Sequence, residues 1–271
     1  MEDSSASNGV SSSSGITDVT DLERYHVNGI PETAYYVPGF ISEEEEAILL
    51  QRVYESPKPK WTQLSNRRLQ NWGGHPHAKG MIPEDLPLWL QLCASKIAKL
   101  GIFGEKIPNH VLVNEYLPGQ GIMPHVDGPV FFPVITTLNL GSHAVINYYT
   151  PADSTSAASS PTEKPLSDST YQDVTEVEQP LSETQKRLDP RLVFSLLLQP
   201  RSLLIVKDDL YTRYLHGIYA VKEDVLDNKI ANLKVCDKEV GTVMKRDTRV
   251  SLTIRLAQNT SKFKMSFFKT K

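Results

Sequence analysis

The hydrophobic pattern of the chain changes near residue 110, and this change constrains the fold more than any other feature of the sequence. Beyond it, a period of two runs through short segments rich in β-branched and aromatic residues, with Pro-Gly, Gly-Ser and Gln-Pro-Arg turns between them. The pattern predicts strands over His110–Tyr116, Val134–Leu140, Ala144–Tyr149, Leu192–Leu198, Ser202–Lys207, Gly217–Val221 and Val250–Leu256. We therefore expect an all-β barrel or jelly roll in this part of the chain.

The residues before this change predict two helices. Ser42 is suited to cap a helix over 41–54, because four glutamates follow it at the positive end of the helix dipole. The stripe that this helix would bury consists of the apolar residues at positions 47, 49, 50, 53 and 54. A second helix, over 87–100, is expected to bury Leu88, Leu92, Ile97 and Leu100. Helices first and strands later indicate an α+β fold, with flanking N-terminal helices on a β core.

Two acidic segments differ from the rest of the chain. Residues 1–20 contain three acids and no base, and residues 151–190 contain 17 Ser, Thr or Pro residues, eight acids and three bases. Such segments bury too little apolar surface to offset the entropy of ordering, so both are predicted to be disordered. We expect one domain over 21–271, with 151–190 as an acidic insertion. The formal charge is −3 for the whole chain, but the residues outside both segments carry 26 bases and 21 acids, or +5.

The composition predicts a globular protein of the cytoplasm and nucleus. Cys93 and Cys236 are too few for a disulfide framework and fit a reducing compartment. The first 20 residues lack the apolar core of a signal peptide, and no apolar run approaches the roughly 18 residues of a membrane span. We expect a monomer that does not associate with membranes.

The motif Met-Pro-His125-Val-Asp127 contains two side chains that can bind a metal ion, an imidazole and a carboxylate. Residues two apart on a strand face the same side, so His125 and Asp127 can hold one ion. His216, just before a predicted strand, is the best candidate for a third ligand. Two histidines and a carboxylate form the facial triad that binds Fe(II) and leaves positions open for substrate and dioxygen. A surface histidine beside a turn aspartate is the alternative, since roughly 0.8 such pairs are expected by chance.

A late strand has one polar face and one apolar face. The polar face contains Arg249, Ser251, Thr253 and Arg255. Two arginines that point into a barrel need anionic partners, because an unpaired buried charge is costly. A dicarboxylate ligand would supply them, since a guanidinium group binds a carboxylate through two parallel hydrogen bonds. A solvated strand face is the alternative.

Asn114 and Tyr116 share a face of the strand that precedes the metal motif, where both can hydrogen-bond a carboxylate. In chain order, the motifs Asn114-x-Tyr116, His125-x-Asp127, His216 and Arg249-x5-Arg255 resemble those of the AlkB family of Fe(II)- and 2-oxoglutarate-dependent dioxygenases. The Gly-Pro after Asp127 is similar to one eukaryotic branch of that family. The resemblance implies a double-stranded β-helix (jelly-roll) fold and three small partners, namely Fe(II), 2-oxoglutarate and O2.

The resemblance also implies roles for individual residues. The iron ligands would be His125, Asp127 and His216. Arg249 would pair with the far carboxylate of 2-oxoglutarate, and Arg255 would lie near its metal-chelating end. Further hydrogen bonds would come from Asn114, Tyr116 and Thr253. The implied reaction converts 2-oxoglutarate to succinate and CO2 and hydroxylates a C–H bond; on an N-methyl group it releases formaldehyde.

The segment 61–77 lies where the family places a flexible nucleotide-recognition lid. Its candidate substrate-binding residues are Arg67, Arg68 and Trp72, because arginine binds phosphate and aromatic rings stack on bases. A loop whose arginines pair with nearby carboxylates is the alternative. The resemblance implies methylated nucleic acid as the substrate, with RNA or single-stranded DNA favoured.

One position departs from the family pattern. Repair-type members carry an acidic residue two places after the metal aspartate, where this chain has Pro129. Activity on 1-methyladenine and 3-methylcytosine is therefore an open question. Two other functions remain open, namely an oxygenase that acts on protein side chains and a non-catalytic nucleic-acid reader on the same fold.

Overall fold

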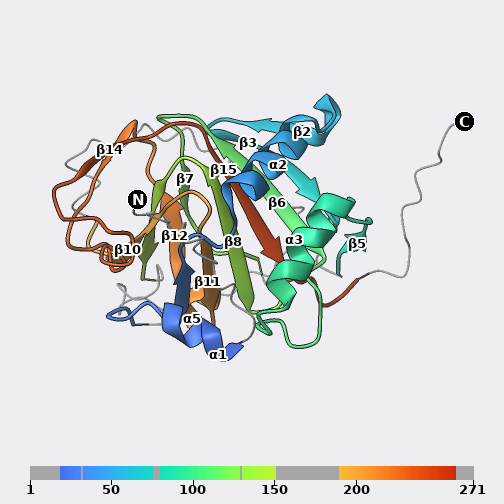
Figure 1. The fold of residues 1–271 in the computed structure, drawn as a ribbon, viewed down its shortest axis with the longest axis horizontal. Coiled ribbons are helices and arrows are strands. Elements are labelled where there is room, and N and C mark those ends of the chain that lie inside the picture. The colour runs from blue at the N-terminus through green and yellow to red at the C-terminus, as the bar shows by residue number, and fades with distance from the viewer. Residues whose placement is uncertain (1–18, 32, 76–79, 129, 151–188, 261–271) are drawn as a thin grey trace, which may run out of the picture.

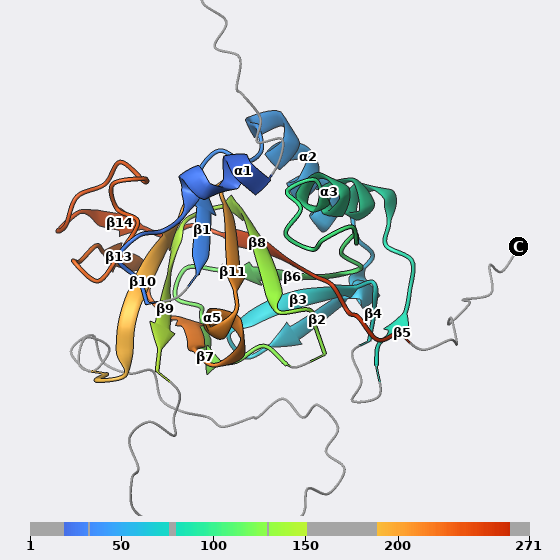
Figure 2. The ribbon, with the colours of Figure 1, turned by 90° about the horizontal axis from the view of Figure 1, so that it is seen from below.

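The computed structural model describes residues 19–31, 33–75, 80–128, 130–150 and 189–260, and its core consists of two antiparallel sheets (Figures 1 and 2). The large sheet has the strand order β1-β11-β8-β15-β6-β3-β2. Its strands are β1 (Ala34–Val37), β2 (Trp61–Leu64), β3 (Arg67–Trp72), β6 (His110–Tyr116), β8 (Val134–Gly141), β11 (Leu203–Lys207) and β15 (Arg249–Arg255).

The small sheet has the order β10-β9-β12-β7. Its strands are β7 (Ile122–His125), β9 (Ala144–Tyr149), β10 (Leu192–Leu198) and β12 (Leu215–Ile218). Two short ribbons pair β4 (Gly74–His75) with β5 (Ile82–Pro83), and β13 (Glu223–Val225) with β14 (Val243–Lys245). The two main sheets enclose a cavity between them, which is the predicted jelly-roll arrangement.

Helices cover the outer face of the large sheet. Figure 2 shows α2 (Glu43–Tyr54) and α3 (Leu88–Ala98) together on that side, and their apolar residues share one core cluster with β8, β11 and β15. Two shorter helices are α1 (Val19–Leu22) and α5 (Asp209–Thr212), and the 3-10 turns span Glu23–Tyr25 and Lys58–Lys60. No helix in the described ranges combines the length and apolar character that a membrane crossing needs.

The cap of α2 is confirmed. The Ser42 hydroxyl accepts a hydrogen bond from the Glu45 amide at 3.2 Å, and the Glu45 carboxylate accepts one from the Ser42 amide at 2.9 Å. This reciprocal capping box satisfies two backbone donors at the helix start. The predicted stripe is only partly correct, because Leu49 and Val53 are buried but Tyr54 is 47% exposed.

The predicted face of α3 is wrong for its first half. Leu88 and Leu92 are 69% and 64% exposed, and the buried residues are Leu90, Cys93, Ala94 and Ile97. Apolar residues occur all around the first two turns, so their spacing could not identify the face that packs on the sheet. The buried Ile97 and Leu100 agree with the prediction.

Six of the seven predicted strands are present within a residue of their expected bounds. The seventh is β12, which begins two residues earlier than predicted and ends at Ile218, where its pairing with β9 also ends. The segment 61–77, expected as a flexible lid, instead forms β2 and β3 as far as Trp72, and β3 pairs with β6 from Arg68 to Trp72. The polar composition of this segment is unusual for a strand, so the sequence did not predict that it forms the half-buried edge of the large sheet.

The predicted disorder falls almost wholly on residues that the structure does not describe. Of the segment 1–20, the described residues are 19 and 20, which begin α1, and of 151–190 they are Asp189 and Pro190. The disorder of both segments therefore stays a prediction.

Candidate metal centre and its cavity

The pairing of β7 with β12 brings two histidines together. His125 lies directly opposite His216 in the register of these strands, and their rings are 4.4 Å apart between centroids. Asp127 follows β7 by two residues, and its carboxylate lies 3.7 Å from His216 Nε2. One ligand atom from each residue lies within 4.8 Å of the other two. The structure thus assembles the three ligands predicted from the sequence into one possible coordination sphere.

Each ligand is held in the form that a metal ion requires. His125 Nδ1 donates a hydrogen bond to the Met123 carbonyl at 2.8 Å, which leaves the lone pair on Nε2. Burial lowers the pKa of both histidines, to about 4 for His216, so both imidazoles are neutral at pH 7. Burial opposes ionisation of Asp127, but Arg255 and the two histidines hold its pKa below the usual value. The site therefore presents two neutral imidazoles and one carboxylate.

Gly217 keeps β7 and β12 at the distance that this centre needs. A Cβ at this position would lie 2.9 Å from the Pro124 nitrogen and 3.0 Å from the Ile122 carbonyl oxygen. We expect Gly217→Ala to separate the strands and to weaken Fe(II) binding at least about 10-fold, as loss of support for a ligand does. Metal titration of folded protein would measure this. Gly241→Ala is the control, since nothing lies within 4 Å of its Cβ position, although its φ of +88° adds local strain. Unchanged iron affinity in Gly217→Ala would contradict this role.

The centre opens into a cavity of about 210 Å³ between the two sheets. Every residue that the sequence pointed to for 2-oxoglutarate lines it, namely Asn114, Tyr116, Arg249, Thr253 and Arg255. Along β15 the predicted alternation is present, because the apolar residues at 250, 252 and 254 face the outer core instead. The volume suits a small molecule rather than a drug-sized one.

The surroundings of Arg249 show whether the cavity suits a bound dicarboxylate. Arg249 is 3% exposed, and its Nη2 donates to Asn139 Oδ1 at 2.7 Å. Nε and Nη1 have no hydrogen-bond partner in the structure. Burial lowers the pKa of Arg249 to about 10, so it remains charged at pH 7. No described carboxylate pairs with it, and a buried cation of this kind is costly unless a bound anion neutralises it.

Arg255 links the cavity wall to the metal centre. Its Nη2 lies 2.9 Å from Asp127 Oδ1, and its guanidinium group lies over the ring of Phe131 at 4.8 Å. Nε is buried without a partner. Arg255 thus positions a metal ligand and still has one donor free for a bound anion.

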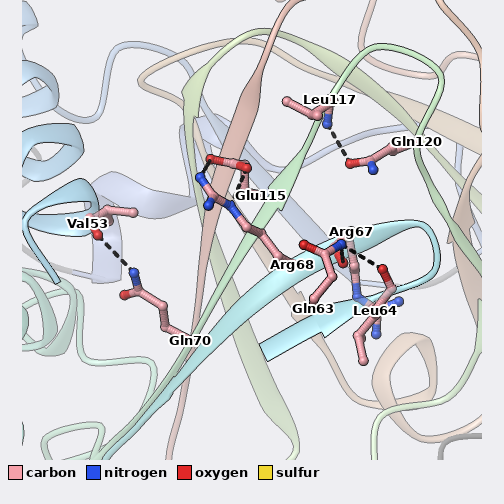
Figure 3. A network of polar contacts seen from close by, with 9 residues as sticks. All are labelled: Val53, Gln63, Leu64, Arg67, Arg68, Gln70, Glu115, Leu117 and Gln120. Carbon is pink, nitrogen blue, oxygen red and sulfur yellow. Dashed lines mark hydrogen bonds and ion pairs between the residues drawn. The ribbon is translucent and has the colours of Figure 1, made fainter. Parts of the chain in front are cut away.

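Strand alternation separates the three candidate substrate residues of β3. Arg67 lines the cavity, and its Nε donates to Asn114 Oδ1 at 3.3 Å. Arg68 is on the other face, where it binds Glu115 through two hydrogen bonds of 2.6 and 2.8 Å (Figure 3). Trp72 is also on that face and packs edge-on against Trp89 of α3. Of the three, only Arg67 faces the metal centre.

Arg68 behaves as a structural residue in this arrangement. The Glu115 side chain is 5% exposed and that of Arg68 is 37% exposed, so loss of Arg68 leaves a buried carboxylate without its charged partner. We expect Arg68→Ala to lower the free energy of unfolding by about 2 kcal/mol, below the full value for a buried pair because Arg68 is partly exposed. Chemical denaturation measures this change. Turnover per folded molecule should be unchanged, and a large loss of turnover without loss of stability would contradict this assignment.

Two residues that matter here were missed in the sequence. Asn139 is fully buried and orients Arg249, and Tyr148 lines the cavity with its ring 6.1 Å from that of His216. Asn139 is a polar residue within an otherwise apolar strand end, which is a recognisable signal. Tyr148 gives no signal, because an aromatic residue in a strand is ordinary.

Comparison with known proteins gives a family match over the same region. The model described as the 2OG-Fe(II) oxygenase superfamily matches residues 60–255, which include the three candidate ligands and both cavity arginines. A protein of Danio rerio described as probable RNA/DNA demethylase ALKBH6 is 49% identical over 237 residues, covering 88% of this chain and 91% of the relative.

Two more distant relatives extend the comparison. The uncharacterized protein L905 of Acanthamoeba polyphaga mimivirus is 26% identical over 225 residues, covering 81% of this chain and 82% of the relative. The tRNA (carboxymethyluridine(34)-5-O)-methyltransferase alkbh8 of Xenopus tropicalis is 24% identical over 239 residues, covering 83% of this chain but 32% of the relative.

Proposed function

We propose that this chain, which belongs to the AlkB family of the 2OG-Fe(II) oxygenase superfamily, is a demethylase of nucleic acid. It would remove methyl groups from the nitrogen atoms of the bases. The family and branch predicted from the sequence are confirmed by the match to ALKBH6 over most of both chains. The protein is thus a 2-oxoglutarate-dependent dioxygenase that uses Fe(II) and O2. The proposal concerns its substrate, with RNA or single-stranded DNA preferred.

The reaction joins two oxidations. When iron is bound with 2-oxoglutarate and O2, it supplies the oxidising power that converts 2-oxoglutarate to succinate and CO2 and hydroxylates the methyl group. One oxygen atom enters succinate and the other enters the methyl group. The resulting N–CH2OH group breaks its C–N bond to release formaldehyde, and the nitrogen retains a hydrogen atom.

The residues of the chain supply the binding and orientation for this chemistry. His125, Asp127 and His216 would hold the iron, and Arg255 fixes the Asp127 carboxylate. The unpartnered guanidinium of Arg249 would bind the far carboxylate of 2-oxoglutarate. This buried cation, in the same cavity as the triad, is the observation that carries the cofactor assignment.

Three observations support nucleic acid as the substrate. The relative at 49% identity is described as a probable RNA/DNA demethylase. The chain outside the two acidic segments has a formal charge of +5, which favours a polyanion. Arg67 also presents a cation at the cavity wall.

A turnover screen tests the proposal. Purified, iron-loaded protein would be incubated with pools of methylated RNA, methylated DNA and methylated peptides, and formaldehyde and succinate would be measured. We expect formaldehyde from a nucleic-acid pool and none with His125→Ala. Formaldehyde or hydroxylation with peptides alone would establish the protein-side-chain alternative. Oligonucleotide binding that survives His125→Ala, with no turnover in any pool, would favour a non-catalytic reader.

A further inference from the structure

The charged residues around the cavity affect which methylated bases can bind there, according to the charge of the base. Asp127 is the only acidic residue among the described residues that line the cavity. Its carboxylate is already engaged by Arg255 at 2.9 Å and lies beside two histidines. The described cavity wall therefore offers no free carboxylate to a substrate.

Arg67 adds a positive charge that is not neutralised. Its Nε donates a 3.3 Å hydrogen bond to Asn114, and it forms no ion pair with a described residue. The next arginine along the strand, Arg68, is fully paired with Glu115 on the opposite face. Neither Nη group of Arg67 forms a hydrogen bond with a described residue, so both can donate to a substrate acceptor.

Methylated bases fall into two chemical groups that such a wall distinguishes. Methylation at N1 of adenine or N3 of cytosine gives a ring that is cationic near neutral pH and carries an exocyclic amino group. Methylation at N1 of guanine or N3 of uracil gives a neutral ring with a carbonyl oxygen at the corresponding position. A cationic ring beside Arg67 would meet a like charge and find no free carboxylate in the described cavity wall, whereas a carbonyl oxygen can accept from the guanidinium group.

We infer that the site selects neutral, carbonyl-bearing N-methylated bases over cationic ones, and that Arg67 is the residue that determines this specificity. The inference rests on the proposed function, since it names the class of base that the same site demethylates. Bidentate recognition of a base edge by arginine corresponds to roughly 10- to 100-fold discrimination. We therefore expect at least about a tenfold preference.

Two matched pairs of oligonucleotides test the inference. One pair carries 3-methyluridine or 3-methylcytidine at the same position of one RNA sequence, and the other carries 1-methylguanosine or 1-methyladenosine. Within each pair the methyl position is the same. The pyrimidine members differ in one exocyclic group and the ring charge, and the purine members differ in addition by the 2-amino group of guanine. The value of kcat/KM for formaldehyde release and the Kd of each labelled oligonucleotide would be measured. We expect the neutral member of each pair to be favoured.

Variants at position 67 assign the preference to this residue. Arg67→Gln should reduce the preference to within a few-fold, and Arg67→Glu should reverse it in favour of the cationic bases. Arg67→Lys retains the charge and should retain part of the preference, which separates a local charge effect from misfolding. Arg52→Gln is the control, because it removes one positive charge from the exposed face of α2, where Arg52 pairs with Glu55.

The outcomes separate this inference from the proposed function. Demethylation with equal or greater kcat/KM for the cationic bases would overturn the inference and leave the proposed function intact. An equal loss on all four oligonucleotides in Arg67→Gln would also overturn it, because Arg67 would then support turnover in general and not the choice of base. Absence of formaldehyde from every oligonucleotide, with turnover on peptides, would overturn both.

Discussion

Replacement of Arg249 by methionine is expected to abolish 2-oxoglutarate binding without destabilising the protein that lacks the co-substrate. The wild-type guanidinium group is buried, charged and lacks a partner on Nε and Nη1, so its removal relieves a desolvation penalty that offsets the loss of its hydrogen bond to Asn139. Methionine fills similar volume with apolar atoms. The lost interaction consists of charge-assisted hydrogen bonds, each contributing about 1.5–3 kcal/mol, so two of them correspond to a loss of at least about 100-fold in affinity.

Calorimetry and thermal unfolding of the same samples measure the two effects. Wild-type protein loaded with Mn(II) should bind 2-oxoglutarate and unfold at a higher temperature in its presence. Arg249→Met should show neither effect, while its unfolding temperature without ligand equals or exceeds that of the wild type. Arg213→Met is a matched control, because Arg213 is exposed and pairs with Asp209 on α5. Retained 2-oxoglutarate binding in Arg249→Met would show that another group binds the far carboxylate.

Replacement of His216 by alanine is expected to remove tightly bound iron and to reduce succinate formation by more than about 100-fold, the upper range for loss of a residue that merely supports a ligand. The reason is geometric, since the remaining ligands, His125 at the end of β7 and Asp127 two residues further on, supply only two of the three positions of a facial triad. Metal analysis after gel filtration gives the iron stoichiometry directly. His26→Ala is the control, because His26 lies outside the cavity beside Tyr35. Full iron occupancy in His216→Ala would exclude His216 as a ligand.

The cavity side of the site could be predicted because β15 alternates clearly. A period of two places Arg249 and Arg255 on one face and leaves the apolar residues on the other, and the structure has this arrangement. The same rule indicates that His125 and Asp127 belong together. Local spacing is therefore enough to predict the metal motif and the arginine pair separately. The resemblance to the AlkB family is what assigned both motifs to one site, although they lie more than 100 residues apart in the chain.

What the sequence could not provide was the register between distant strands. Arg67 and Arg68 are adjacent and chemically identical, and only the pairing of Arg68 with Glu115 across β3 and β6 decides which of them faces the cavity. The same limit applies to α3, whose apolar residues lie all around its first turns and do not identify the packed face. Tertiary pairing settles both choices.

The ratio of formaldehyde to succinate tests the central claim most directly. If the cavity couples 2-oxoglutarate decarboxylation to base demethylation, wild-type protein with its preferred methylated oligonucleotide should release the two products in equal amounts. Both should disappear together in Arg249→Met and His216→Ala. Succinate formed without formaldehyde on every methylated base, with the methyl groups intact by mass spectrometry, would contradict demethylation as the function of this site.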